Sequence, residues 1–91
     1  MTSHQPDPIW TEAVADERLR MLQGIANHVR FEHAGEDAEH LEAELRRRCG
    51  LRDLAVDDGE VAEICRGIAA GRWVDVRRVV RSLHRADAGP R

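Results

Sequence analysis

The residues best equipped for chemistry are the arginines gathered in "GRWVDVRRVVRSLHR", at residues 71–85. A guanidinium is always charged in proteins and donates paired N–H bonds to carboxylates and phosphates. An arginine-rich helix could therefore meet nucleic-acid phosphates, as the second helix of a helix-turn-helix does, or the acidic surface of a protein. The turn "AGRWVD" contains a suitable glycine, but the small residue usual in the preceding helix is out of register with it.

The charge of the whole chain argues against nucleic acid as the main partner. The net charge is −3, lysine is absent, and no row of aromatic residues is available for stacking on bases. Acids concentrate in residues 32–63, whereas residues 64–91 carry seven arginines against two acids. Opposite charges within one fold can pair. We therefore expect the arginine face to meet acids such as Glu39, Glu42 and Asp58, or the acidic surface of a partner.

A second candidate is the stretch "HVRFEHAGEDAEHLEAE", at residues 28–44, which combines metal-ligand side chains. Five of them recur every four residues: His28, Glu32, Glu36, His40 and Glu44. Gly35 should interrupt this ladder, and the inward positions of the following helix belong to Leu41 and Leu45. We therefore expect these side chains to lie in solvent, with neither a metal nor a cofactor bound.

The cysteines and tryptophans complete the set of candidates. Cys49 and Cys65 both fall on apolar seams and are expected to be buried thiols that behave as small hydrophobes. Tryptophan often anchors interfaces. Trp10, near the N-terminus, is the better interface candidate, whereas Trp73 is expected to cap one end of the core.

Helical spacing of apolar residues predicts that four helices position these side chains. They are expected at residues 8–33, 36–49, 58–70 and 76 to about 86. A bend or break is expected in the first near Arg18 or Gly24.

The ends of the later helices carry the clearest local signals. Asp57 is followed three residues later by Glu60, which predicts a capping box, and Asp75 is the expected N-cap of the last helix. Gly50 and Gly71 are expected just past two helix ends. The predicted core includes Ile64, Ile68, Val79 and Leu83.

The expected fold is one all-α domain spanning residues 1–91, a compact bundle of four helices. The connection "LRDLAV" leaves room for one further helical turn, and residues 1–6 and 87–91 are expected to be frayed tails. No signal-peptide pattern and no apolar stretch approaching the ~20 residues of a membrane span is present, so we expect a cytoplasmic protein without membrane contact.

The absence of lysine favours a bacterial genome of high GC content, and "ELRRR" and "EVAEICRGIAAG" resemble an uncharacterised family of short helical actinobacterial proteins. That resemblance implies no activity. We expect a non-enzymatic protein-interaction module, accessory or regulatory, whose partner is another protein or a second copy of the chain. The predicted partner-binding residues are Trp10, Arg72, Trp73, Arg77, Arg78, Arg81 and Arg85. The alternative is a DNA-binding transcriptional regulator that uses the arginine-rich fourth helix.

Overall fold

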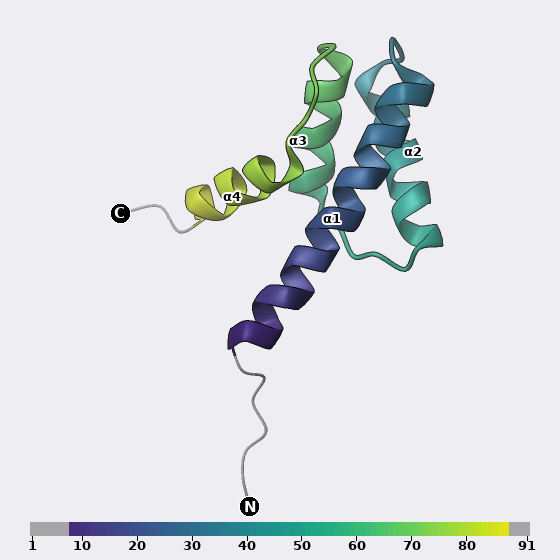
Figure 1. Ribbon diagram of the computed structural model, residues 1–91. Helices are drawn as coiled ribbons and strands as arrows, with labels where there is room; N and C mark the ends of the chain where they lie inside the picture. Colours follow the sequence, from purple (N-terminus) through teal and green to yellow (C-terminus); the bar gives the residue numbers. More distant parts are fainter. Residues whose placement is uncertain (1–7, 88–91) are drawn as a thin grey trace, which may run out of the picture.

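The protein is all-α. The computed structural model describes the backbone of residues 8–87 and the side chains of residues 15–84. Its helices are α1 (Pro8–His33), α2 (Ala38–Leu51), α3 (Asp58–Ala69) and α4 (Val76–Asp87), and no strand occurs within the described backbone (Figure 1). With 26, 14, 12 and 12 residues, they contain more than two-thirds of the 91-residue chain. The all-α prediction is confirmed. Of the tails predicted at residues 1–6 and 87–91, Asp87 is instead the last residue of α4, and residues 1–6 and 88–91 lie outside the described residues.

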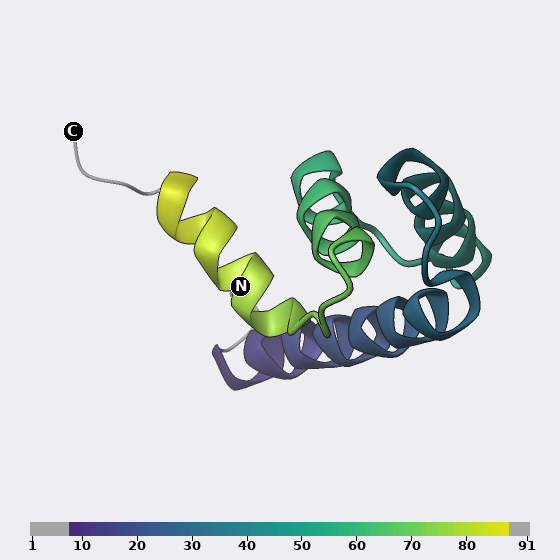
Figure 2. The same cartoon turned by 90° about the horizontal axis from the view of Figure 1, so that it is seen from above.

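Three of the helices pack side by side and the fourth lies across them. α1 packs against α2, α2 against α3, and α4 against both α3 and α1. Figures 1 and 2 show α4 on the opposite side of α3 from α2, pointing away from the other helices. The first turns of α1 also extend beyond this group (Figure 1). The four predicted helices are present, but α4 is a crosswise helix and not a parallel member of a bundle.

The core is aliphatic and takes residues from every helix and from the turn before α4. Its buried members are Leu22, Ile25, Ala26, Val29, Leu41, Leu45, Cys49, Val61, Ile64, Cys65, Ile68, Val74, Val76 and Val80. Ile64 and Ile68 are therefore core residues, as predicted. Val79 is only partly buried and Leu83 lies outside the core, because Val76 and Val80 are the residues of α4 that turn inward.

The predicted capping box at the start of α3 is confirmed and is tied to α1. The backbone N–H of Glu60 donates to Asp57 Oδ1 at 2.8 Å, and the N–H of Asp57 donates to Glu60 Oε1 at 3.1 Å. Arg18 of α1 donates from Nη2 to the same Glu60 oxygen at 2.5 Å and from Nε to the Ala55 carbonyl at 3.1 Å. The predicted break near Arg18 is wrong: α1 is one continuous helix, and Arg18 joins it to α3.

Both ends of α2 differ from the prediction. Asp37 is the N-cap, because its side chain accepts from the His40 N–H at 2.9 Å, so Glu36 precedes the helix. Gly50 lies inside α2, not beyond it, and Arg52 is the C-cap. The chain leaves the helix through Asp53, whose φ of 56° is in the left-handed region.

The turn from α3 to α4 depends on two glycines. Gly71 adopts φ 80°, which agrees with its predicted place past the helix end. Gly67 is buried, and a Cβ on it would lie 2.6 Å from Val74 Cγ2. The missing side chain therefore lets Val74 pack directly on α3.

A single side chain of α1 holds the start of α4. Gln23 donates from Nε2 to the Val74 carbonyl at 2.8 Å and accepts from the Val76 N–H through Oε1 at 2.9 Å. Two turns earlier on α1, Asp16 pairs with Arg77. These contacts set where α4 begins and which of its sides faces α1.

Candidate functional site

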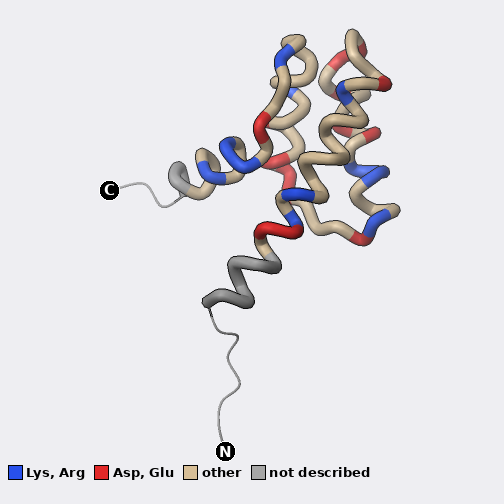
Figure 3. The backbone as a smooth tube through the Cα atoms, viewed as in Figure 1, with Lys and Arg blue, Asp and Glu red and all other residues tan. Residues whose placement is uncertain are grey.

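The arginines predicted to bind a partner lie along α4 and in the loop before it (Figure 3). We call the exposed group Arg72, Trp73, Arg77, Arg78 and Arg81 the α4 surface. Two other predicted residues, Trp10 and Arg85, lie outside the residues whose side chains the structure describes. Trp73 is 58% exposed, so the prediction that it caps the core is wrong. Val74 takes the buried position of this turn instead.

An open groove of about 750 Å³ runs beside this surface, between the end of α3 and α4. Val79 and Leu83 of α4 give it apolar walls, while Trp73, Arg72 and Arg78 line it from the loop and the helix. Val79 and Leu83, which are not fully buried, therefore line this groove.

Fewer arginines of the α4 surface pair with acids of the same chain than we expected from the sequence. Arg77 pairs with Asp16 of α1 and not with the predicted acids, because α2 lies on the far side of α3 (Figure 2). Of those acids, Asp58 pairs with Arg46 at 2.8 Å. The other three arginines, Arg72, Arg78 and Arg81, form no ion pair with any side chain in residues 15–84.

Two acids also line the groove, and both have local partners. Glu63 pairs with Arg66 one turn along α3. Asp75 accepts from the backbone N–H of Arg78 at 3.4 Å, as expected for the N-cap of α4. The groove therefore offers positive charge from the loop and from the outer side of α4.

The histidines and glutamates that recur every four residues do not form one site, because several of them form ion pairs with different partners. Glu32 pairs with Arg48, and Glu44 accepts from Arg48 Nε at 2.6 Å and from Arg47 Nη2 at 2.7 Å. The hydrogen bonds from Arg47 and Arg48 lower the pKa of Glu44 from 4.5 to about 2. Its carboxylate is thus charged and occupied, so it is a poor ligand for a metal.

The remaining members of the ladder meet a histidine that the spacing did not include. His33 Nδ1 lies 2.7 Å from Glu36 Oε2, and His40 Nε2 lies 3.5 Å from Glu36 Oε1. His28 lies elsewhere, in a pocket beside α2. Within the described residues no group of three His, Cys, Asp or Glu side chains could hold a metal ion.

Both cysteines are buried free thiols, as predicted. Burial raises the pKa of Cys49 and raises that of Cys65 to about 12. A thiol with so high a pKa is almost entirely protonated at neutral pH, so Cys65 is a packing residue and not a nucleophile.

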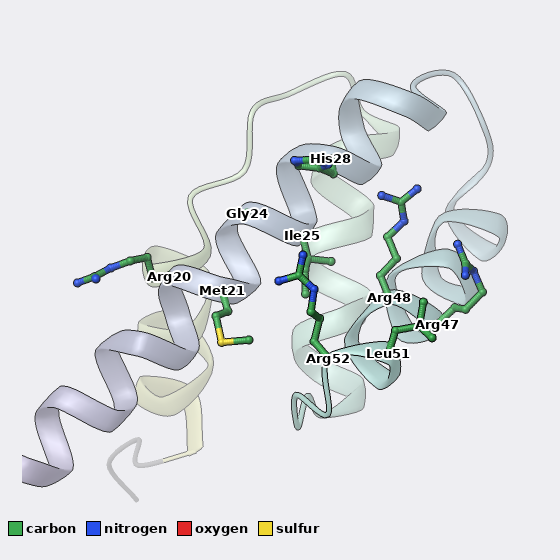
Figure 4. Close-up of a pocket in the computed structure, with 9 residues that line it drawn as sticks. All are labelled: Arg20, Met21, Gly24, Ile25, His28, Arg47, Arg48, Leu51 and Arg52. Carbon is green, nitrogen blue, oxygen red and sulfur yellow. The ribbon is translucent and has the colours of Figure 1, made fainter.

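Sequence reasoning missed a pocket of about 370 Å³ between α1 and the end of α2. Figure 4 shows its lining residues: Arg20, Met21, Gly24, Ile25, His28, Arg47, Arg48, Leu51 and Arg52. The one available signal was the apolar Leu51, three positions after the basic stretch 46–48, where we expected a loop.

No protein-family model, curated protein or solved structure matches this chain. The resemblance to short helical actinobacterial proteins therefore gains no support. No helix in the described residues is both long and apolar enough to cross a membrane.

Proposed function

We propose that this protein is a non-enzymatic interaction module that binds an acidic, partly apolar segment of another protein on the α4 surface. The observation that carries the proposal is Trp73, which is 58% exposed and lines the groove between α3 and α4. Tryptophan buries a large apolar area on binding and is enriched among the residues that dominate interface energies.

The charges around Trp73 indicate the chemistry of the partner. Arg72, Arg78 and Arg81 are exposed and without an acid among the described side chains, so they favour a partner that brings carboxylates. Val79 and Leu83 add an apolar wall that a side chain of the partner would cover.

Contacts with α3 and α1 hold the α4 surface in position. Val74 packs against Gly67 of α3. Gln23 of α1 forms hydrogen bonds with the Val74 carbonyl and the Val76 N–H. A preorganised surface loses little conformational freedom on binding, which increases affinity. Arg77, bound to Asp16, belongs to this support and is not proposed as a contact.

The experiment first identifies the partner and then measures the surface. A photo-crosslinking amino acid replaces Trp73 in the native host, and the same substitution at Phe31, which is 86% exposed, is the control for a reactive exposed aromatic position. A protein captured only through position 73 is purified, and its affinity is measured by calorimetry.

Trp73→Ala should weaken this affinity by at least about tenfold, as expected for a hot-spot residue, and Phe31→Ala should leave it unchanged. Sedimentation of the protein alone tests the case of a second copy, in which Trp73→Ala would convert an oligomer to a monomer. Equal affinity of the wild type and the Trp73→Ala protein would contradict the proposal.

The alternative, a DNA-binding regulator, is favoured by one observation. Arg77, Arg78 and Arg81 line a common hollow of about 620 Å³ on the outside of α4. If they contact phosphates, duplex affinity should fall by roughly 0.9 log units per log unit of salt for each contact. The substitution of all three by glutamine should then abolish binding. We expect no duplex binding at physiological salt in either protein.

A further inference from the structure

The residues that line the pocket between α1 and α2 include several bases and no acid. Its side chains are basic or apolar, and no carboxylate lines it. The basic members come from two helices: Arg20 and His28 from α1, and Arg47 and Arg48 from α2, followed by Arg52 at its end. A ligand entering here meets positive charge without a competing acid in the wall.

Three of these arginines pair with acids that do not line the pocket, and Arg20 does so through Asp16 and Glu17. Glu44 accepts from Arg48 Nε at 2.6 Å and from Arg47 Nε at 3.1 Å, and Glu32 pairs with Arg48. A guanidinium has five N–H donors, and Arg48 uses two of its donor nitrogens in these bonds. The rest are available to a ligand, on a side chain whose orientation is already set.

Arg52 is the least engaged of these cations. It is exposed and forms no ion pair with a side chain in the described part of the chain. Figure 4 shows Arg48 and Arg52 extending from α2 toward α1, whereas Arg20 extends away from the pocket. Arg48 and Arg52 are therefore the two lining arginines that reach from α2 toward α1.

The rest of the pocket is apolar and has room. Ile25 and Met21 of α1 form part of its wall, and Leu51 is 73% exposed at its edge. A Cβ added to Gly24 would meet nothing within 4 Å, so the absent side chain leaves space on the α1 side. The volume of about 370 Å³ falls within the range of roughly 300–1,000 Å³ that is typical of small-molecule sites.

We propose that this pocket binds a small organic anion that carries an apolar body, such as a carboxylate on a short hydrocarbon chain. Arg48 and Arg52 bind the anionic group, and Ile25, Met21 and Leu51 cover the hydrocarbon. The site shares no lining residue with the α3–α4 groove, so this proposal does not depend on the proposed interaction module.

The test uses three probes on the whole protein labelled with ¹⁵N: octanoate, the neutral octanamide, and inorganic phosphate. Octanoate should give saturable shifts of the Gly24, His28 and Leu51 amide signals and leave Trp73 unmoved. Octanamide lacks the charge and phosphate lacks the apolar body, so each should bind at least about tenfold more weakly.

Two pairs of variants separate the pocket from general effects. Gly24→Trp fills the pocket, whereas Gly50→Trp adds the same side chain to another exposed helical glycine with open space around it. Arg52→Gln removes a proposed contact, and Arg30→Gln removes one positive charge from an exposed residue elsewhere. The far-ultraviolet spectra of all four should match that of the wild type.

Loss of octanoate binding in Gly24→Trp alone, with about tenfold weaker binding in Arg52→Gln than in Arg30→Gln, would support the proposal. The proposal is overturned if octanoate shifts no pocket signal at millimolar concentration, or if octanamide or phosphate binds as well. It is equally overturned if each variant behaves like its control, or if the protein binds anionic lipid vesicles but not free octanoate.

Discussion

Gly67 and Gly24 both lie in helices, yet a methyl group would meet opposite surroundings at the two positions. At Gly67 the added Cβ would lie 2.6 Å from Val74 Cγ2, and at Gly24 it would find nothing within 4 Å. Val74 is buried and β-branched, so it has little freedom to rotate away. The two glycines therefore differ in what they do: the first permits a close contact, and the second leaves a surface open.

Gly67→Ala should lower the free energy of unfolding by about 1–3 kcal/mol, since the methyl group overpacks the contact with Val74. Gly24→Ala should raise it by about 0.5–1 kcal/mol, because alanine is the better helix former. Urea denaturation of the two variants measures both changes. Equal effects would show that Val74 moves aside without cost.

Glu44 predicts a pH dependence of stability. Its pKa is lowered from 4.5 to about 2 in the folded protein by hydrogen bonds from Arg47 and Arg48. A group whose pKa is depressed on folding stabilises the protein above its unfolded pKa, and that stabilisation is lost as the pH falls toward the folded value. The contribution of Glu44 is thus complete above about pH 4.5 and is lost between there and about pH 2.

In Glu44→Gln, the unfolding free energy should decline less steeply between pH 4.5 and pH 2 than in the wild type. Some decline remains, because Arg48 also lowers the pKa of Glu32. Chemical denaturation at a series of pH values gives the comparison, with Glu39→Gln as the control at an exposed position. Parallel curves for Glu44→Gln and the wild type would disprove the effect.

At the scale of elements, α4 is positioned by its buried residues and by polar contacts with α1. Val76 and Val80 bury its inner side, but its later turns leave the core. Gln23 satisfies the Val74 carbonyl and the Val76 N–H, which are otherwise without a partner at the start of the helix. The polar link between α1 and α4 therefore consists of one amide side chain and the Asp16–Arg77 ion pair.

Gln23→Ala should destabilise the protein by about 1–3 kcal/mol, because it leaves two partly buried backbone groups unpaired. Native-state hydrogen exchange should become faster at the Val80 amide of α4 while Leu45 of α2 stays protected. Asn27→Ala is the control, since it removes only the exposed bond between Asn27 and Gln23. Uniform acceleration in both helices would mean that Gln23 stabilises the whole fold and not α4 in particular.

At the scale of the molecule, some charged side chains on the surface form ion pairs and others do not. The arginines of α2 bind acids near them: Arg47 and Arg48 bind Glu44, Arg48 also binds Glu32, and Arg46 binds Asp58. Among the arginines without an ion pair to a described side chain are Arg72, Arg78 and Arg81 on the α4 surface and Arg52 at the α1–α2 pocket. The protein therefore presents two separate basic regions although its net charge is −3.

Dialysis against a chelator should leave the melting temperature unchanged. Three glutamates of the histidine-rich stretch, Glu32, Glu36 and Glu44, pair with Arg48, Arg47 or His33, and the described residues contain no set of ligands for a metal. Differential scanning calorimetry before and after dialysis measures the change. A fall of many degrees that zinc reverses would show a structural metal site.

The sequence by itself determined the helices and much of their capping, because these depend on residues three or four positions apart. The capping box of Asp57 and Glu60 and the stop at Gly71 are local arrangements, and both could be predicted. The burial of Ile64 and Ile68 followed from helical periodicity in the same way. The break at Gly24 and the stop at Gly50 were wrong, since glycine only weakens a helix that tertiary contacts hold together.

Only the tertiary structure decided how α4 leaves the core and what its arginines meet. Arg77 pairs with a residue 61 positions away, and no local rule connects Asp16 to it. The direction of α4 follows from the packing of Val74 on Gly67 and from the hydrogen bonds of Gln23, and that direction exposes Trp73 and moves Leu83 out of the core. The α1–α2 pocket likewise exists only where two helices meet, because side chains from distant segments form its walls.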